Sequence, residues 1–476
     1  MGLPRVCTQT RTPLRAKNQK QKGEINVKKV ISIALTLLMV AVMLPVMAMA
    51  AEVTTAENLQ AAVATDGEVT LGDNITASIT IPAGKTVTLN LNGKTLTNET
   101  GKDTITVALG GTLTIEGTGT VDNVTDGKAA LYNNGTVVLN GGTYDRSAET
   151  STGKTTAERG NNSWYTVCNH GTLTINSGVT ITTAGKSTDK GRFSSLIENG
   201  YQNQASGNER TGYVNGTNQE YPTLTINGGE FFGGINTIKN DDNGIAKING
   251  GSSTNYYQSS VQNHHKMTIN NGSFTGEAAW SVLNCGADCV YNADHDAHEL
   301  IITNGNFKGD VRANVGNVEI KGGSFEASFT EEGNANIEIS GGTFNTNVKN
   351  LARETVVVGY GNNYYVGDDA AAIVANAQSG TITVENVGNN NSFTVKPGVT
   401  VQNNWTDNIT VNGERVNPQA TYTVPGAPII IYTPTEDTPK ADNQKNPGTG
   451  ANDFVGVAAA MAVVSLLGAA AVIRKK

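Results

Sequence analysis

Short segments in which apolar and polar residues alternate recur along the chain, and each contains a glycine-bearing turn. A period of two predicts strands that bury one face and turn the other toward water. The segments share the order strand, corner, strand, and nine of them are TLTIEGTGTV (112–121), TVVLNGGTYD (136–145), TLTINSGVTI (172–181), TLTINGGEFF (223–232), IAKINGGSST (245–254), KMTINNGSFT (266–275), LIITNGNFKG (300–309), NVEIKGGSFE (317–326) and NIEISGGTFN (336–345).

The corner between the two strands has nearly the same chemistry throughout. Glycine stands three places after the last aliphatic residue of the first strand in eight of the nine segments. Glycine adopts positive φ without a steric penalty, so the chain can turn sharply into the next strand. An aromatic residue then re-enters the core five places after the same aliphatic residue, at Tyr144, Phe231, Phe274, Phe307, Phe325 and Phe344.

The spacing of the repeat indicates a solenoid. The last aliphatic residues of the first strands, counted from Leu91, follow one another at intervals of 24, 24, 36, 51, 22, 21, 33, 18 and 19 residues. A base period lengthened by insertions predicts a β-solenoid whose coils bury their inner faces against their neighbours. A β-sandwich is the alternative, but it would not require one corner at the same offset in every unit.

These segments resemble the right-handed parallel β-helix of the pectin-lyase-like superfamily. The resemblance covers about residues 55–350 and includes a first coil at 64–98. It implies an all-β fold with a parallel β-helix of about ten coils over 51–350. The preceding sequence TTAENLQAAVATD (54–66) predicts a short amphipathic helix that caps the open end.

Beyond residue 350 the corner chemistry is lost. Alternating segments continue through 351–423, which predicts a C-terminal β cap or a small β domain. Residues 424–449 are rich in proline and polar residues, and we expect them to form an extended linker.

Both ends of the chain carry targeting patterns. A lysine pair, an apolar run over 30–44 and the sequence AMA at 48–50 predict a signal peptide over residues 1–50, cleaved before Ala51. An uncleaved membrane anchor is the alternative. At the other end, the apolar segment 454–473 is long enough for a transmembrane helix, and the basic sequence RKK follows it.

Residues 446–476 combine a short motif, an apolar span and a basic tail, and this order resembles the sorting signal of Gram-positive surface proteins. There a sortase cuts between threonine and glycine and joins the threonine to peptidoglycan. The resemblance implies sortase and peptidoglycan as partners and an extracellular, cell-wall-anchored location, with a plain C-terminal anchor as the alternative. The motif starts with Asn-Pro where Leu-Pro is usual, which leaves the sortase class open. It consists of Asn446, Pro447, Gly448, Thr449 and Gly450.

The predicted mature chain is strongly acidic. Between residues 51 and 449 it holds 23 Lys and Arg against 40 Asp and Glu, a formal net charge of −17. Such a polyanion repels nucleic acid and anionic lipid, so neither is expected as a partner. The charge also argues against binding highly acidic pectin unless calcium bridges the two.

The sequence contains no complete catalytic set of the superfamily. Glu319 and Glu338 hold the same outward position in consecutive coils, so we expect their carboxylates about 5 Å apart, as in a retaining glycosidase. Two solvated glutamates beside Lys321 are the alternative. Polygalacturonase motifs are incomplete. Asp310 and Arg312 are weak candidates for the calcium-dependent chemistry of a pectate lyase, which would make calcium a cofactor.

The sequence CNHG (168–171) is interpreted as part of the repeat. His170 stands in a corner position that asparagine fills in several other coils. A lone reduced Cys168 in a coil core needs no functional explanation. We therefore expect no catalytic role for His170.

The insertion at 278–300 is the densest group of metal-ligating residue types. Zinc accepts thiolate and imidazole ligands, so the insertion predicts a zinc site. A disulfide between the two cysteines, which an extracellular location permits, or free thiols are the alternatives. The proposed ligands are Cys285, Cys289, His295, His298 and His265, the last on the adjacent coil.

Aromatic residues in and near the insertions are candidates for stacking on sugar rings. Aromatics that only pin their own loops are the alternative. The candidates are Trp164, Tyr165, Tyr213, Tyr257 and Trp280.

Together these patterns predict a secreted, cell-wall-anchored protein that binds glycans or host or microbial surfaces as an adhesin. The sequence favours a protein without enzymatic activity. A polysaccharide lyase or glycoside hydrolase on the same fold is the alternative, because one fold can serve both roles. A passive structural stalk is a second alternative.

Overall fold

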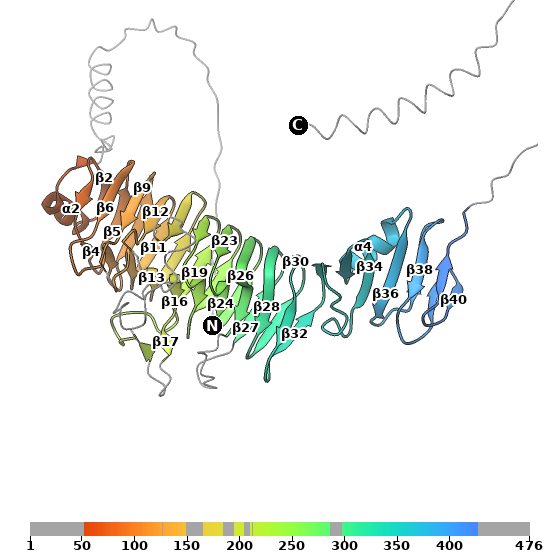
Figure 1. Cartoon of the computed structure of the whole chain (residues 1–476). Helices are drawn as coiled ribbons and strands as arrows, with labels where there is room; N and C mark the ends of the chain where they lie inside the picture. Colours follow the sequence, from red (N-terminus) through yellow and green to blue (C-terminus); the bar gives the residue numbers. More distant parts are fainter. Residues whose placement is uncertain are drawn as a thin grey trace, which may run out of the picture. The chain divides into compact units, whose positions relative to one another are not determined.

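The computed structural model describes residues 52–125, 127–148, 165–183, 195–203, 210–211, 213–285 and 298–426 (Figure 1). Strands dominate this part of the chain, and two helices occur in it. The predicted signal peptide, most of the linker, the sorting motif and the apolar segment 454–473 lie outside it. Among the described residues, no helix has the length and apolar character needed to cross a membrane.

One long parallel sheet contains the strands that precede the glycine corners, and we call it row one. Its strands lie side by side in an order that follows the chain from one coil to the next (Figure 1). They are β1 (Glu52–Val53), β2 (Gly67–Leu71), β5 (Thr86–Asn90), β8 (Thr112–Glu116), β11 (Thr136–Leu139), β14 (Thr172–Ile175), β19 (Thr223–Ile226), β22 (Ile245–Ile248), β25 (Lys266–Ile269), β27 (Glu299–Ile302), β29 (Asn317–Ile320) and β32 (Asn336–Ile339).

The strands that follow the corners form row two, which is also parallel. They are β3 (Ile75–Thr76), β6 (Lys94–Thr97), β9 (Gly119–Asp122), β12 (Gly142–Asp145), β15 (Val179–Thr182), β20 (Glu230–Phe232), β23 (Ser252–Asn255), β26 (Ser273–Asn284), β28 (Asn306–Ala313), β30 (Ser324–Glu326) and β33 (Gly342–Phe344).

A third parallel row completes each coil and joins row two through the long strands β26 and β28. Its other strands are β4 (Ile79–Ile81), β7 (Ile105–Val107), β10 (Leu131–Asn133), β13 (Tyr165–Asn169), β16 (Ser195–Asn199), β21 (Asn236–Asn240), β24 (Ser259–Asn263) and β31 (Phe329–Glu331). In addition, β17 (Gln202–Asn203) and β18 (Arg210–Thr211) pair antiparallel. Three parallel rows with one strand per coil are consistent with the parallel β-helix that the repeat predicts.

The core lies inside the coils, where the sequence pattern places it. Every last aliphatic residue of the repeat, from Ile115 to Ile339, is buried. The predicted aromatic residues are buried too, and Phe307 stacks between Phe274 and Phe325 with ring centroids 5.1 Å and 4.6 Å away. The corners need glycine: Gly251 has φ +99°, and a Cβ there would lie 3.0 Å from the carbonyl oxygen of Gly229.

A helix closes the first coil, as the sequence predicts. It is α2 (Ala56–Val63), and the hydroxyl oxygen of Thr55 accepts a hydrogen bond from the amide of Asn58 at its N-terminus. Leu59 and Val63 are buried and belong to the core of the coils. Burying one such side chain contributes about 2 kcal/mol, which is enough to hold a helix this short in place.

The region after residue 350 has a second core of its own. The sequence predicts only strands here, and the structure adds the helix α4 (Asp368–Asn376), whose alanine-rich sequence and acidic first turn favour helix. Its strands, most of them antiparallel, are β34 (Val356–Tyr360), β35 (Asn363–Val366), β36 (Thr381–Val387), β37 (Ser392–Phe393), β38 (Thr400–Asn403), β39 (Ile409–Val411), β40 (Glu414–Val416) and β41 (Thr421–Thr423).

Candidate functional site

A buried ladder of asparagines follows the ends of the row-three strands. Each side-chain amide nitrogen except that of the last member, Asn284, donates to the amide oxygen of the asparagine on the next coil, at 2.7–2.9 Å. A slip of one residue would remove these bonds, so the ladder fixes the register of the coils. Its members are Asn133, Asn169, Asn199, Asn240, Asn263 and Asn284.

The residues just before the ladder form what we call the polar column. Its members are register partners on consecutive coils: Tyr132, Cys168, Glu198, Lys239 and Gln262. The preceding residues, such as Val167 and Ile197, belong to the core. Because strand side chains alternate, the column faces away from that core. Even so, Cys168, Glu198, Lys239 and Gln262 are at most 5% exposed.

Cys168, His170 and Glu198 meet in the polar column, and we call them the Cys168 cluster. The sulfur of Cys168 lies 2.9 Å from Oε2 of Glu198, to which the thiol donates, and 3.5 Å from Nε2 of His170. Nε2 of His170 is 3.7 Å from the same Glu198 oxygen. Burial, and then the Glu198 carboxylate, raise the pKa of the Cys168 thiol well above its usual value. The thiol is therefore protonated while no cation is bound.

Two tyrosines hold the His170 ring in place. The hydroxyl of Tyr132 lies 3.2 Å from Nδ1 of His170, so Nε2 is the nitrogen that faces Cys168 and Glu198. The ring of Tyr201 lies over the imidazole with centroids 4.6 Å apart, and Tyr213 packs edge-on against Tyr201. Tyr213, a predicted sugar-binding residue, therefore helps to position His170 through its contact with Tyr201.

A second group, the Asp241 cluster, combines Asp241, Asp242 and His264. Nδ1 of His264 lies 3.3 Å from an oxygen of Asp241 and 3.9 Å from one of Asp242. Nζ of Lys239 is 2.8 Å from the other Asp241 oxygen. All four side chains are buried, and the lysine compensates carboxylate charge that would otherwise be costly.

The predicted zinc ligands are only partly within the described residues. Cys285 is buried and disulfide-bonded, so its sulfur is not available as a thiolate. His265 is buried with Nδ1 3.1 Å from the carbonyl oxygen of Gly244. Burial, followed by His264 and His265, lowers the pKa of His298 to about 4. The disulfide is the alternative that the sequence analysis named for Cys285, and it removes this residue from the predicted ligand set. Cys289 and His295 lie outside the described residues, and zinc binding by the remaining residues stays a prediction.

The predicted carboxylate pair lies on the surface of row one. Glu319 and Glu338 are register partners on β29 and β32. Nζ of Lys321 is 3.1 Å from Oε2 of Glu319, and Glu338 lines a small hollow with Arg353. The two glutamates therefore lie in one column, and one of them, Glu319, forms an ion pair with Lys321.

The predicted sugar-binding aromatics that the structure describes have different surroundings. Trp164 lies outside the described residues. Tyr257 is 38% exposed, whereas Trp280 is half-buried with Cζ of Arg312 5.2 Å from its ring centroid. Burial, followed by the Glu198 carboxylate, raises the pKa of the Tyr165 hydroxyl well above its usual value.

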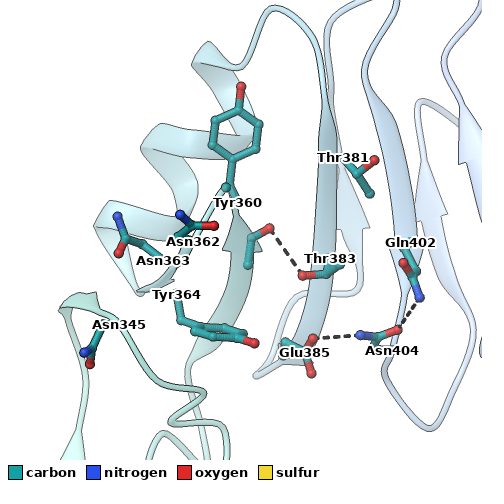
Figure 2. A pocket seen from close by; sticks show the side chains of 12 residues that line it. Asn345, Tyr360, Asn362, Asn363, Tyr364, Thr381, Thr383, Glu385, Gln402 and Asn404 are labelled. Carbon is teal, nitrogen blue, oxygen red and sulfur yellow. Dashed lines mark hydrogen bonds between the residues drawn. The ribbon is translucent and has the colours of Figure 1, made fainter. Parts of the chain in front are cut away.

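A groove that the sequence did not predict lies on the C-terminal β region, and we call it the C-terminal groove. It has a volume of 640 Å³. Figure 2 shows its side chains, which come from β34, β35, β36, β38 and the turns beside them. The labelled residues are Asn345, Tyr360, Asn362, Asn363, Tyr364, Thr381, Thr383, Glu385, Gln402 and Asn404.

Gly359 lines this groove with backbone only, because it has no side chain. A Cβ at Gly359 would clash with Oγ1 of Thr383 and would lie 3.4 Å from the ring of Tyr364. The ring of Tyr364 extends along the groove toward Glu385 (Figure 2). Tyr364 therefore presents an aromatic surface next to a bare stretch of backbone.

Polar side chains along the groove are already oriented by one another. Asn404 donates to Oε1 of Glu385 at 2.7 Å, and Gln402 donates to Oδ1 of Asn404 at 3.0 Å (Figure 2). Nζ of Lys349 lies 3.6 Å from the other Glu385 oxygen. The groove thus offers amide and carboxylate groups in fixed positions beside an aromatic ring.

No family model, curated protein or solved structure matches the chain. Function is therefore inferred from the chemistry of the two polar clusters and the C-terminal groove alone.

Proposed function

We propose that this protein is a cell-wall-anchored extracellular adhesin that binds glycans in the C-terminal groove. In this proposal the coils form a right-handed parallel β-helix of the pectin-lyase-like type, and the sorting motif 446–450 joins the protein to peptidoglycan. The observation that carries the proposal is the ring of Tyr364 beside the hydrogen-bonded set Gln402, Asn404 and Glu385.

This combination suits a sugar because a sugar ring has two kinds of surface. Its C–H groups pack against an aromatic ring, and its hydroxyls need directed donors and acceptors. Tyr364 supplies the first surface, and the amides of Gln402 and Asn404 supply the second. Gly359 leaves the space in which the ring would lie.

The charge of the groove favours neutral sugars over acidic ones. Among the lining residues, Glu385 is the one ionisable carboxylate, and no lysine or arginine is present. Lys349 is already paired with Glu385 and is not a lining residue, so the groove offers no lining cation to pair with an acidic sugar. We therefore expect neutral hexoses or N-acetylated sugars as the preferred ligands.

The same groove favours binding over hydrolysis. Glycosidases generally use two carboxyl groups on either side of the scissile bond, and the groove has one. That carboxylate is engaged by Asn404 and Lys349. A bound sugar is therefore expected to leave unchanged.

A glycan array combined with a reducing-sugar assay on the same panel tests the proposal. We expect binding without product, and Tyr364→Ala should weaken binding at least about 10-fold, the equivalent of one lost aromatic contact. Tyr257→Ala is the matched control, because Tyr257 is an exposed tyrosine on the coils. Binding that depends on Tyr257 but not Tyr364 would move the site to the coils.

A glycoside hydrolase or lyase is the second candidate, favoured by the register pairing of Glu319 with Glu338. Product in the reducing-sugar assay that disappears in both Glu319→Gln and Glu338→Gln would establish it. Product that survives both substitutions would exclude this pair as the catalytic residues.

A further inference from the structure

The Cys168 cluster differs from the rest of the polar column in its chemistry. It brings a thiol, an imidazole and a carboxylate together, with their ligand atoms within 4.8 Å of one another. Cys168 is the free cysteine among the described residues, and all three side chains are buried. We propose that Cys168, His170 and Glu198 bind a zinc ion that links two consecutive coils. This inference does not depend on the proposed glycan binding.

The backbone positions two of the ligands without further adjustment. Cys168 on β13 and Glu198 on β16 are direct register partners, so their side chains leave neighbouring strands in the same direction. His170 follows Cys168 by two residues, just beyond the ladder residue Asn169. The buried ladder bond from Asn169 to Asn199 holds the two strand ends at a fixed separation.

The distances fit a tetrahedral ion. Bonds of about 2.3 Å to sulfur and about 2.0 Å to nitrogen or oxygen place the ligand atoms of a tetrahedron roughly 3.5 Å apart. The separations from Nε2 of His170 are 3.5 Å to the sulfur and 3.7 Å to the carboxylate oxygen. The third, 2.9 Å, is the thiol–carboxylate hydrogen bond, which zinc would replace when the thiol loses its proton.

The histidine already has the orientation that zinc binding needs. Nε2 faces the cluster, and Nδ1 lies 3.2 Å from the hydroxyl of Tyr132. A metal-bound histidine commonly donates its other N–H to such a partner, which fixes the ring and its tautomer. Tyr201 limits rotation of the imidazole from the other side.

The ligand types select zinc over calcium or magnesium. Sulfur and nitrogen donors suit zinc, whereas calcium and magnesium take oxygen ligands. Zinc with one thiolate and one carboxylate is electrically neutral, and a neutral assembly is the least costly one to bury. Three protein ligands would leave a fourth position for water.

The Asp241 cluster is a weaker candidate and serves as an internal control. Its carboxylates already have Lys239 as a cation, at 2.8 Å from Asp241. A divalent ion would have to displace that lysine or lie close to it. We therefore assign the zinc to the Cys168 cluster.

The test uses the full chain, purified without a histidine tag and stripped of metal with a chelator. Zinc is then titrated in, and Co²⁺ is used as a second probe because a cobalt–thiolate bond gives a charge-transfer absorption band. We expect one zinc per chain, a higher unfolding temperature with zinc, and the thiolate band with cobalt. A folded chain that binds no zinc would overturn the proposal.

Four variants locate the ion. Cys168→Ser and Glu198→Gln should each weaken zinc binding at least about 100-fold, and Cys168→Ser should also lose the cobalt–thiolate band. Tyr132→Phe keeps all ligands and should weaken binding about 10-fold. Asp241→Asn should leave binding unchanged, with folding of each variant checked by circular dichroism.

Two results would place the ion elsewhere. Zinc binding that survives both Cys168→Ser and Glu198→Gln but is lost in His298→Asn would assign it to the 278–300 insertion. Binding that is lost only in Asp241→Asn would assign it to the Asp241 cluster. Either result overturns the proposal, and Glu198→Gln decides the matter if Cys168→Ser does not fold.

Discussion

The side-chain amide of Asn199 donates to the side-chain oxygen of Asn240 at 2.7 Å, between two consecutive coils and out of contact with water. A similar ladder runs along the exposed side of row one, where Asn227 donates to Asn176 at 2.9 Å. Both ladders join consecutive coils by amide–amide hydrogen bonds, but they donate in opposite directions and differ in burial.

Asn199→Ala should therefore be far more destabilising than Asn227→Ala. Removing Asn199 leaves buried amide groups of Asn169 and Asn240 without their partner, at a cost of about 2–4 kcal/mol. Around Asn227 water can replace the lost bonds, so the cost should stay below about 1 kcal/mol. Urea midpoints of the two variants give the comparison, and equal shifts would contradict it.

Phe307→Ala should open a cavity in the stack of phenylalanines. Phe307 is buried between Phe274 and Phe325, so we expect a loss of about 3–5 kcal/mol in the free energy of unfolding. Phe232→Ala is the matched control, because Phe232 is only half-buried on the outside of row two. Thermal unfolding should show a large decrease for the first variant and a small one for the second.

Acid should destabilise the region around His298. Its pKa of about 4 in the folded chain lies below the ordinary value of 6.5, so the unfolded chain binds the proton more readily. The contribution of neutral His298 is present above about pH 6.5 and is lost as the pH falls toward 4. We expect a loss of about 3 kcal/mol over this range.

Urea midpoints between pH 7 and pH 4 measure this loss, with His298→Asn as the comparison. Asparagine adopts positive φ readily, and His298 has φ +43°, so the variant should fold. The pH dependence of the variant should be weaker than that of the wild-type protein. Identical curves would show that His298 does not cause the loss.

Thr449→Ala should release the protein from the cell wall. A sortase needs the threonine to form the acyl intermediate that peptidoglycan attacks, so the variant is expected in the membrane or the medium. Thr433→Ala lies in the same linker and should remain attached. Fractionation of cells into wall, membrane and medium measures the outcome, and unchanged attachment of Thr449→Ala would refute the sorting signal.

The interior of the coils could be predicted from the sequence because its chemistry repeats. Ile115, Ile226 and Phe325 occupy positions fixed by the alternation and the glycine corner, and all three are buried. The strands after residue 350 also follow from alternation. The helix α4 was missed because short alanine-rich segments have no strong pattern beyond their propensity.

The sequence does not predict the two polar clusters, because its repeat is clearest in the strands of row one and the clusters lie on row three. Glu198 lies in a coil interrupted by insertions, so its pairing with Cys168 was hidden. Aligning on the ladder residues Asn169, Asn199 and Asn240 would have brought Cys168 and Glu198 into one column. The backbone of CNHG is part of the repeat, as the sequence predicts. The contacts of Cys168 and His170 with Glu198 are not evident from that pattern.

The C-terminal groove left no signal of this kind. It depends on the position of Gly359 between two neighbouring strands. Gly359 is the register partner of Tyr364 on one of them and of Thr383 on the other. Such a meeting of strands is a property of the folded sheet and not of any short sequence.

The buried asparagine ladder also bears on how such a chain can change in length. Each asparagine donates toward one end and accepts from the other, and the ends are closed by the backbone: the amide of Gly135 at Asn133, and carbonyl oxygens of His298 and Val315 at Asn284. A whole coil inserted by gene duplication would extend this line of dipoles without leaving an unpaired amide. A fraction of a coil would break it. We therefore expect that insertions and deletions in the evolution of this chain add or remove complete coils.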